Sequence, residues 1–180
     1  PGDAAVYEKT PQLAQASIGQ NDVSATPLQM AMVAGAIGNG GTMMTPHVMA
    51  EVRDRKQESI DTYQPSVWRT PVSKETAEIM RRGMVEVATN GTAKAMAIGG
   101  VEVGGKTGTA QLGTPDPKSH AWVIGFAGPA GQPAQVAVAV LVQGQPGASE
   151  QTGGRVAAPI AKRVLEAALA APVQPGTAGR

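Results

Sequence analysis

Apolar residues recur at helical spacing in three separate stretches of the chain. The first stretch follows Thr26, whose side chain can cap a helix, with Pro27 at the first helical position and Gln29 three residues after the cap. The second and third stretches cover residues 73–89 and 155–170. Each pattern predicts an amphipathic helix, and we expect the first helix to end at the Asn-Gly-Gly sequence that follows it.

The same spacing predicts which side of each later helix faces the core. Ser73 has the side chain of an N-cap for the earlier of the two. The residues expected to face inward are Ile79, Met80, Met84, Val87 and Ala88 in that helix, and Ile160, Val164, Leu165, Ala168 and Leu169 in the last one.

Strands are predicted where polar and apolar residues alternate or where β-branched residues run together. Segments of this kind at residues 101–111, 120–127 and 134–142 follow one another closely, separated by loops of Gly, Pro and Asp. Loops this short join antiparallel neighbours. We also expect a strand within 46–54 and a weaker one within 58–69.

Together these elements predict an α+β fold, in which helices pack against an antiparallel β-sheet. A length of 180 residues is that of one domain. Residues 1–25 are rich in small and polar side chains, which predicts a loop, and the Pro- and Gly-rich tail at 172–180 is expected to be disordered.

Composition narrows the classes of function. The formal net charge is +1 and basic residues are scattered, so the chain lacks the basic stripe of a nucleic-acid-binding protein. Cysteine is absent, which removes disulfides, thiolate catalysis and cysteine-based zinc sites. The two histidines, His47 and His120, have no carboxylate pattern around them, so we expect no metal site.

The stretch GGVEVGGKTGTAQL at residues 99–112 carries the main candidate for chemistry. Residues 100–107 fit the phosphate-binding pattern G-x-x-x-x-G-K-[ST]. In a phosphate-binding loop a buried strand precedes the pattern and a helix begins at the lysine. Gly108 and the β-branched Thr109 oppose a helix here, so a nucleotide site is the least favoured interpretation.

A strand that carries Lys106, Thr107, Gly108 and Thr109 suits a carboxylate ligand instead. The ammonium supplies charge and the hydroxyls supply hydrogen bonds. Gly108 lets a ligand backbone approach, and an extended peptide can pair with the strand if it lies at a sheet edge. By chance a Lys-[Ser/Thr]-Gly triplet occurs in roughly one chain in ten of this length, so context must decide.

Several separated segments supply that context. They are SIGQNDVSATPLQMAMVAGAIGNGGTMMTPHV, GGKTGTAQ, HAWVIGFAG and VAVAVLVQ, followed by a closing helix. In this order they resemble the C-terminal half of the transpeptidase domain of class B penicillin-binding proteins, over most of residues 17–170. Residues 1–171 are then the C-terminal portion of such a domain, and Gln20 and Asn21 are expected to border its cleft.

The resemblance implies acyl transfer on peptidoglycan. The family places three motifs around one cleft: S-x-x-K with the nucleophilic serine, S-x-N, and K-[ST]-G. The serine attacks a D-Ala-D-Ala stem peptide, β-lactams acylate the same serine, and no cofactor is needed. By carry-over, Lys106 sets the electrostatics of the cleft and Thr107 and Thr109 bind the substrate carboxylate beside Gly108. The backbone N–H of Thr109 is one half of the oxyanion hole.

The chain departs from the family in lacking two of its three motifs. No serine has a lysine three residues later, and no S-x-N occurs. The resemblance therefore implies a nucleophile upstream of Pro1, in an N-terminal remainder with a membrane anchor at the extracytoplasmic face of the bacterial membrane. The implied partners are that remainder, peptidoglycan stem peptides, β-lactam antibiotics, and membrane proteins of the divisome or elongasome.

Two alternatives stay open at this point. A serine β-lactamase or DD-carboxypeptidase of the same fold differs mainly in how water reaches the acyl-enzyme, so the rate of deacylation separates it from a transpeptidase. A non-catalytic penicillin sensor or peptide-binding domain would lack the serine upstream as well.

Because S-x-x-K is missing, we expect these 180 residues alone to form no covalent adduct with a fluorescent penicillin. Intact-protein mass spectrometry after incubation measures the adduct. Stoichiometric labelling would place the nucleophile among these residues and overturn its assignment elsewhere.

Overall fold

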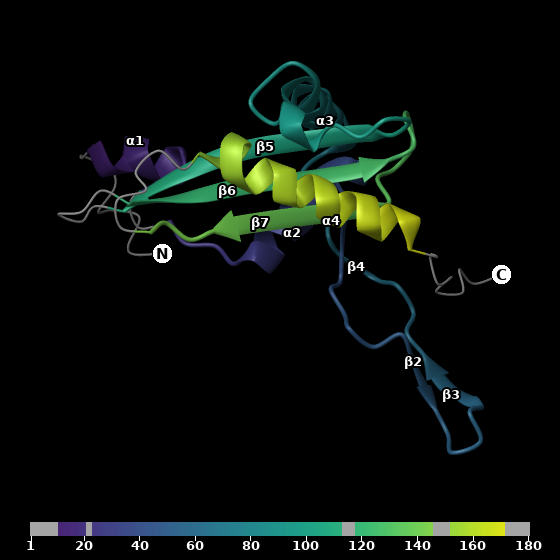
Figure 1. Ribbon diagram of the computed structural model, residues 1–180. Coiled ribbons are helices and arrows are strands. Elements are labelled where there is room, and N and C mark those ends of the chain that lie inside the picture. The colour runs from purple at the N-terminus through teal and green to yellow at the C-terminus, as the bar shows by residue number, and fades with distance from the viewer. Residues whose placement is uncertain (1–10, 21–22, 113–117, 146–151, 172–180) are drawn as a thin grey trace.

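The computed structural model describes residues 11–20, 23–112, 118–145 and 152–171 (Figure 1). The tail at 172–180, Asn21 and the first part of the predicted N-terminal loop lie outside these ranges. Within that predicted loop, a short helix forms instead: α1 (Pro11–Ser17). Its proline occupies the first turn, and the Gln, Leu and Ala residues after it have good helix propensity.

A three-stranded antiparallel sheet forms the centre of the fold. Its strands are β5 (Glu102–Leu112), β6 (Lys118–Gly128) and β7 (Val136–Val142), in the spatial order β5–β6–β7. This confirms the three strands predicted from the sequence. Among the described strands, β5 is paired only on its β6 side, so its other edge is open.

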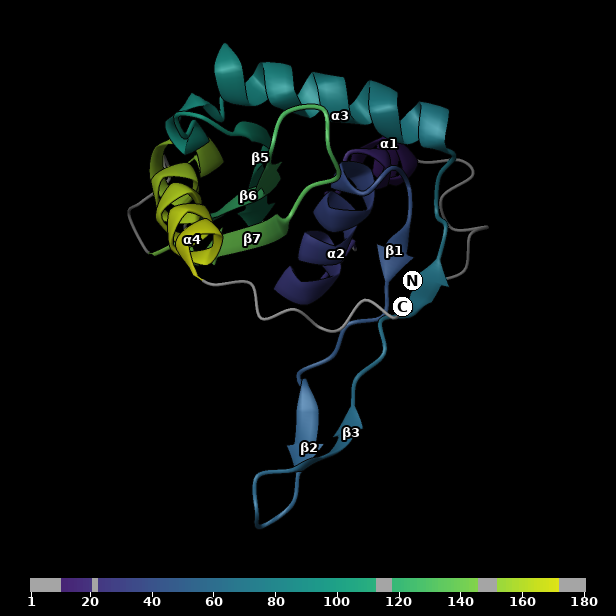
Figure 2. The same ribbon diagram turned by 90° about the vertical axis from the view of Figure 1, so that its right-hand side faces the viewer.

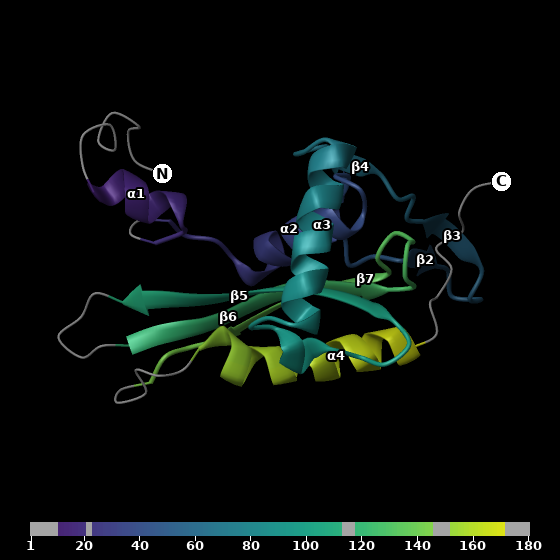
Figure 3. The same cartoon turned by 90° about the horizontal axis from the view of Figure 1, so that it is seen from above.

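Helices cover both faces of the sheet (Figure 2, Figure 3). On one face lies α4 (Ala158–Ala170), which continues from a π-helical turn, η3 (Gly153–Ala157). On the other face lies α2 (Pro27–Gly38), while α3 (Lys74–Thr89) crosses the sheet at the β5 edge. No helix in the described ranges is both long enough and apolar enough to cross a bilayer.

Two hydrophobic clusters fill the space between these layers. Val123 of β6 belongs to the cluster under α4, together with Leu165 of that helix. Ile124 and Phe126 belong to the cluster on the opposite face, with Ile37 of α2. Because successive residues of a strand point to opposite faces, a central strand covered on both sides is apolar where it is covered, as β6 is from Ala121 to Gly128.

The predicted helix caps are present. The backbone N–H of Gln29 donates to Thr26 Oγ1 at 3.2 Å, and the backbone N–H of Thr26 donates to Gln29 Oε1 at 2.8 Å. This reciprocal pair is a capping box, and it satisfies donors that the first turn of α2 leaves free. At the start of α3, Ser73 Oγ accepts a hydrogen bond from the Thr76 N–H at 3.2 Å.

The predicted inward faces of α3 and α4 are only partly right. Met84, Ala88 and Leu165 are buried as expected. Both helices pack along a narrow stripe, and α4 buries only small residues besides its leucine, so the outer parts of each predicted face stay in solvent. The predicted core residues that are exposed instead are Ile79, Met80, Ile160 and Val164.

A hairpin extends away from this body (Figure 1, Figure 2). The strands predicted within 46–54 and 58–69 are shorter than expected, and the second is divided in two around Pro65, which has no N–H to donate. The strands that form are antiparallel pairs in two small sheets: β2 (Glu51–Arg53) with β3 (Ser59–Thr62), and β1 (Met43–Met44) with β4 (Val67–Arg69).

The π-helical turn η3 lies directly against the backbone of the sheet. A Cβ atom on Gly153 would overlap the carbonyl oxygens of Trp122 and Gly108. A Cβ atom on Gly154 would overlap the carbonyl oxygen of Thr92, in the turn after α3. Glycine at both positions therefore lets η3 support β5, β6 and that turn at once.

We expect Gly153→Ala to lower the free energy of unfolding by about 1–3 kcal/mol, because two backbone segments must separate to admit the methyl group. The measurement is urea unfolding followed by circular dichroism. Gly83→Ala is the matched control: Gly83 lies inside α3 with open space around its Cβ position, and alanine there should raise stability by about 0.5–1 kcal/mol. Equal effects of the two substitutions would contradict the contact described for η3.

Candidate functional site

The Lys-Thr-Gly-Thr segment lies in the middle of β5, as the sequence predicts. Lys106 is opposite Ile124 of β6 and begins no helix, so the arrangement of a phosphate-binding loop is absent at this segment. The lysine side chain is exposed. Thr109 is exposed as well, while Thr107 and Gly108 are half-buried.

A cavity of about 270 Å³ lies beside this segment. One wall comes from the sheet, and the other comes from the residues between α1 and α2 together with the start of α2. The lining residues are Lys106, Thr107, Gly108, Thr109, Ala110, Trp122 and Ile124 from the sheet, and Ile18, Gly19, Gln20, Val23, Ala25 and Met30 from the opposite wall.

The ammonium and the hydroxyls approach the strand edge from opposite faces of the sheet. Lys106 is on the same face as Gly104, whose missing side chain leaves room for the Phe126 ring, and this is the α2 face. Thr107 is on the other face, where its hydroxyl contacts that of Thr92. A ligand lying along the edge therefore meets a positive charge on one side and hydroxyl groups on the other.

Two carbonyl groups of β5 point away from β6, toward the open edge. The Lys106 ammonium donates to the carbonyl oxygen of Thr107 at 2.6 Å, and Gln20 Nε2 donates to that of Thr109 at 3.0 Å. In an antiparallel ladder the N–H and C=O of one residue point to the same side of the strand. The backbone N–H groups of Thr107 and Thr109 therefore also face the open edge.

The contact of Gln20 with Thr109 links residues 89 positions apart in the sequence. It holds the segment before α2 against the strand, beside the cavity that both line. The expectation that Gln20 borders the cleft is met by this geometry.

Thr92 contacts a residue of the site, and the sequence did not indicate it. Its Oγ1 lies 2.7 Å from Oγ1 of Thr107, fifteen residues further along the chain. A threonine in the turn after a helix carries no pattern of its own, and only the packing of that turn on η3 brings it to β5.

The start of β5 is held by an arginine of α3. Arg81 Nε donates to Glu102 Oε1 at 2.8 Å, and its Nη2 donates to the carbonyl oxygen of Gln132 at 2.6 Å. The Arg81 and Glu102 side chains are only 15% and 23% exposed, so this pair is less screened by solvent than a surface ion pair. It ties α3, β5 and the turn between β6 and β7 together.

The histidines lie outside this cavity and have structural contacts. His120 Nδ1 accepts a hydrogen bond from the Gly144 N–H at 3.0 Å, and the His47 ring stacks on that of Tyr63 with centroids 3.3 Å apart. Within the ranges that the structure describes, no three His, Asp or Glu side chains gather closely enough to hold a metal ion.

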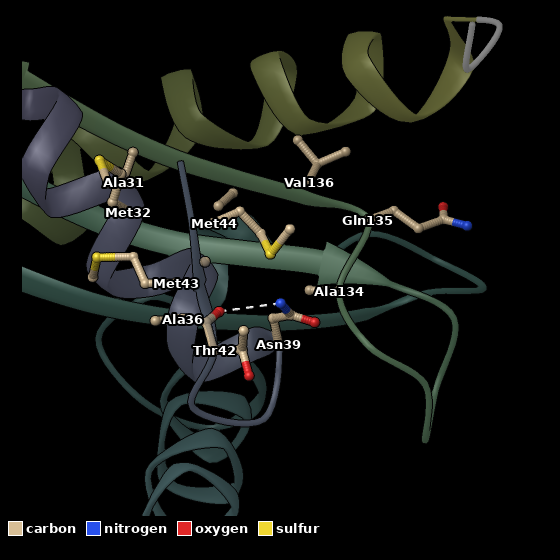
Figure 4. Close-up of a pocket in the computed structure, with 12 residues that line it drawn as sticks. Ala31, Met32, Ala36, Asn39, Thr42, Met43, Met44, Ala134, Gln135 and Val136 are labelled. Atoms are coloured by element: carbon tan, nitrogen blue, oxygen red, sulfur yellow. Dashed lines mark hydrogen bonds between the residues drawn. The ribbon is translucent and has the colours of Figure 1, made fainter. Parts of the chain in front are cut away.

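A second cavity, of about 380 Å³, lies between α2, β1 and β7 (Figure 4). Its walls are mostly Ala and Met side chains, and Asn39 Nδ2 donates to the carbonyl oxygen of Thr42 at 3.1 Å within it. None of its described lining residues is charged, so it offers no acid, base or ion-binding group.

Comparison with known proteins shows the family of this chain. A family model described as the penicillin binding protein transpeptidase domain matches residues 3–166. Peptidoglycan D,D-transpeptidase PbpA of Mycolicibacterium smegmatis is 43% identical over 160 residues, which are 87% of this chain and 32% of that protein. Stage V sporulation protein D of Bacillus subtilis is 36% identical, over 87% of this chain and 24% of its own length.

A solved structure of penicillin-binding protein A from Mycobacterium tuberculosis, a ceftriaxone acyl-enzyme complex, superposes with a TM-score of 0.79 at 41% identity. The match covers 87% of this chain and 35% of that one, so the chain spans about a third of the length of this protein and of PbpA from M. smegmatis. The fold of this chain is the α+β penicillin-recognising fold. The chain belongs to the family of penicillin-binding protein transpeptidase domains.

Proposed function

We propose that residues 1–171 form the C-terminal portion of a serine D,D-transpeptidase domain and supply one wall of its active site. The observation that carries this proposal is the position of Lys106, Thr107 and Thr109 along the open edge of β5, beside a cavity. The family membership and the names of the relatives agree with it. The reaction is acyl transfer from a D-Ala-D-Ala stem peptide, and β-lactams are the inhibitors.

Recognition of the stem peptide follows from the edge itself. An extended peptide can pair with the N–H groups of Thr107 and Thr109, which β5 turns away from β6, as in strand addition. The carboxylate at the end of the peptide then meets the Thr107 and Thr109 hydroxyls, with the Lys106 charge nearby. Gly108 leaves the strand without a side chain between Thr107 and Thr109.

Stabilisation of the transition state is assigned to the backbone N–H of Thr109. Attack on the scissile carbonyl places negative charge on its oxygen, and a donor fixed in advance stabilises that charge without reorganising. The Gln20 contact to the carbonyl of the same residue supports this role: the N–H and C=O of one strand residue point to the same side, so the Thr109 N–H faces the open edge as well.

The serine nucleophile and its lysine come from another part of the protein, since no S-x-x-K occurs in this sequence. The same proposal places the domain at the extracytoplasmic face of the bacterial membrane, held by an N-terminal anchor and working beside membrane proteins of the divisome or elongasome. The name peptidoglycan D,D-transpeptidase, which the relative from Mycolicibacterium smegmatis bears, supports a place at the cell wall.

In the complete protein, we expect Lys106→Ala to slow acylation by a fluorescent penicillin roughly 100-fold or more, because the charge beside the reacting groups is lost. The measurement is the second-order rate constant of acylation. Lys162→Ala is the matched control, since Lys162 lies on α4 and does not line the cavity. Near-normal acylation of a folded Lys106→Ala protein would exclude the role given to this lysine.

The fate of the acyl-enzyme tests the reaction class. A transpeptidase should hold the penicilloyl group for much longer than one catalytic cycle, because its natural acceptor is an amine and water reaches the ester poorly. Release of the label is followed by mass spectrometry after excess penicillin is removed. Rapid, repeated turnover of penicillin would identify a β-lactamase instead, and absence of any adduct in the complete protein would identify a binding module.

A further inference from the structure

We propose that Thr92 is a positioning residue for the carboxylate site: its hydroxyl donates to Thr107 Oγ1 and so leaves the Thr107 proton for the ligand. This inference rests on the proposed function, in which Thr107 binds the substrate carboxylate. It adds a residue that lies outside the K-[ST]-G segment and fixes the direction of a hydrogen bond within it.

The geometry of the two hydroxyls is that of a good hydrogen bond. Their oxygen atoms are 2.7 Å apart, which is the commonest separation for an O–H···O bond. Among the described residues, Thr92 is the hydrogen-bond partner of the Thr107 side chain. Either hydroxyl can be the donor in this pair, and which one donates decides where the Thr107 proton points.

Packing fixes the Thr92 side of this pair. The neighbouring Ala93 is fully buried, and its N–H donates to the carbonyl oxygen of Val87 at 3.1 Å. The Thr92 carbonyl lies against Gly154 of η3, closely enough to exclude a Cβ atom there. The backbone of Thr92 is thus held from both sides, and its hydroxyl has a defined place beside β5.

Packing also orients Thr107. Its Cγ2 methyl group lies 3.7 Å from the Cβ position of Gly154, so the methyl group faces η3. The hydroxyl is left on the side of Thr92. Gly154 of η3 therefore contacts both threonines and positions them relative to each other.

The chemistry of a carboxylate ligand then decides which hydroxyl donates. A hydroxyl has one proton to donate, whereas an ionised carboxylate can only accept. If Thr107 donated to Thr92, it would present lone pairs to the carboxylate and repel it. With a carboxylate bound, the favourable order is Thr92 to Thr107 to carboxylate, and a chain of bonds in one direction strengthens each member.

The test compares Thr92→Val with Thr92→Ser in the complete protein. Valine keeps the branched shape but removes the hydroxyl, and serine keeps the hydroxyl. We expect Thr92→Val to lower the second-order rate constant of acylation by benzylpenicillin about 5- to 10-fold. We expect Thr92→Ser to restore most of the rate. The melting temperature checks folding, and Thr92→Ala replaces the valine variant if that variant is unfolded.

Two further measurements separate positioning from a general structural effect. The methyl ester of benzylpenicillin has no free carboxylate, so it forms no charge-assisted hydrogen bond with Thr107. Thr92→Val should therefore change the rate of acylation by the ester by less than about 2-fold. In a Thr107→Val background, where the intermediate hydroxyl is gone, Thr92→Val should add no further loss. Equal slowing of acid and ester, or losses that add in the double variant, would overturn the role of Thr92.

The variants also distinguish failure of this inference from failure of the proposed function. If a folded Thr107→Val protein reacts with benzylpenicillin at the normal rate, the carboxylate role of Thr107 is wrong and the inference falls with it. If Thr107→Val slows acylation while Thr92→Val does not, the proposed function stands and only the positioning role is rejected.

Discussion

Pairing of β5 on one side only is the constraint on which the site depends. Because β6 occupies one edge of the strand, the polar backbone groups on the other edge must find partners elsewhere. Side chains of the protein bind two of them, the carbonyls of Thr107 and Thr109. Open edges of this kind invite pairing with another chain. Here the middle of the open edge borders a cavity, which is where the proposed peptide ligand would pair.

The open edge is usable because the rest of the strand is rigid. Hydrophobic clusters hold β6 from both faces, and β6 in turn sets the register of β5. The ion pair of Arg81 with Glu102 holds the beginning of the strand, and the glycines of η3 bring a helical turn against its middle at Gly108. Groups on an element supported in this way are held in place before a ligand binds, which recognition and catalysis require.

Local signals predicted much of this arrangement, and long-range packing supplied the rest. The capping box at Thr26, the three successive strands and the position of Lys106 on a strand depend on neighbours a few residues away, and they could be predicted. The contact of Gln20 with Thr109 could only be anticipated as proximity to the cleft. Thr92 had no signal at all, since its place beside β5 depends on how a glycine turn far along the chain packs on it.

The Lys106 ammonium and the Thr107 and Thr109 hydroxyls lie on opposite faces of one strand edge. This placement limits how thick a ligand bound along that edge can be. A ligand that is flat near its anionic end can lie in the plane of the sheet and contact Lys106 on one face and the threonines on the other. A substituent projecting from either face at that point pushes one partner away. Under the proposed function, the strand would favour acyl donors that are slender and extended at this point.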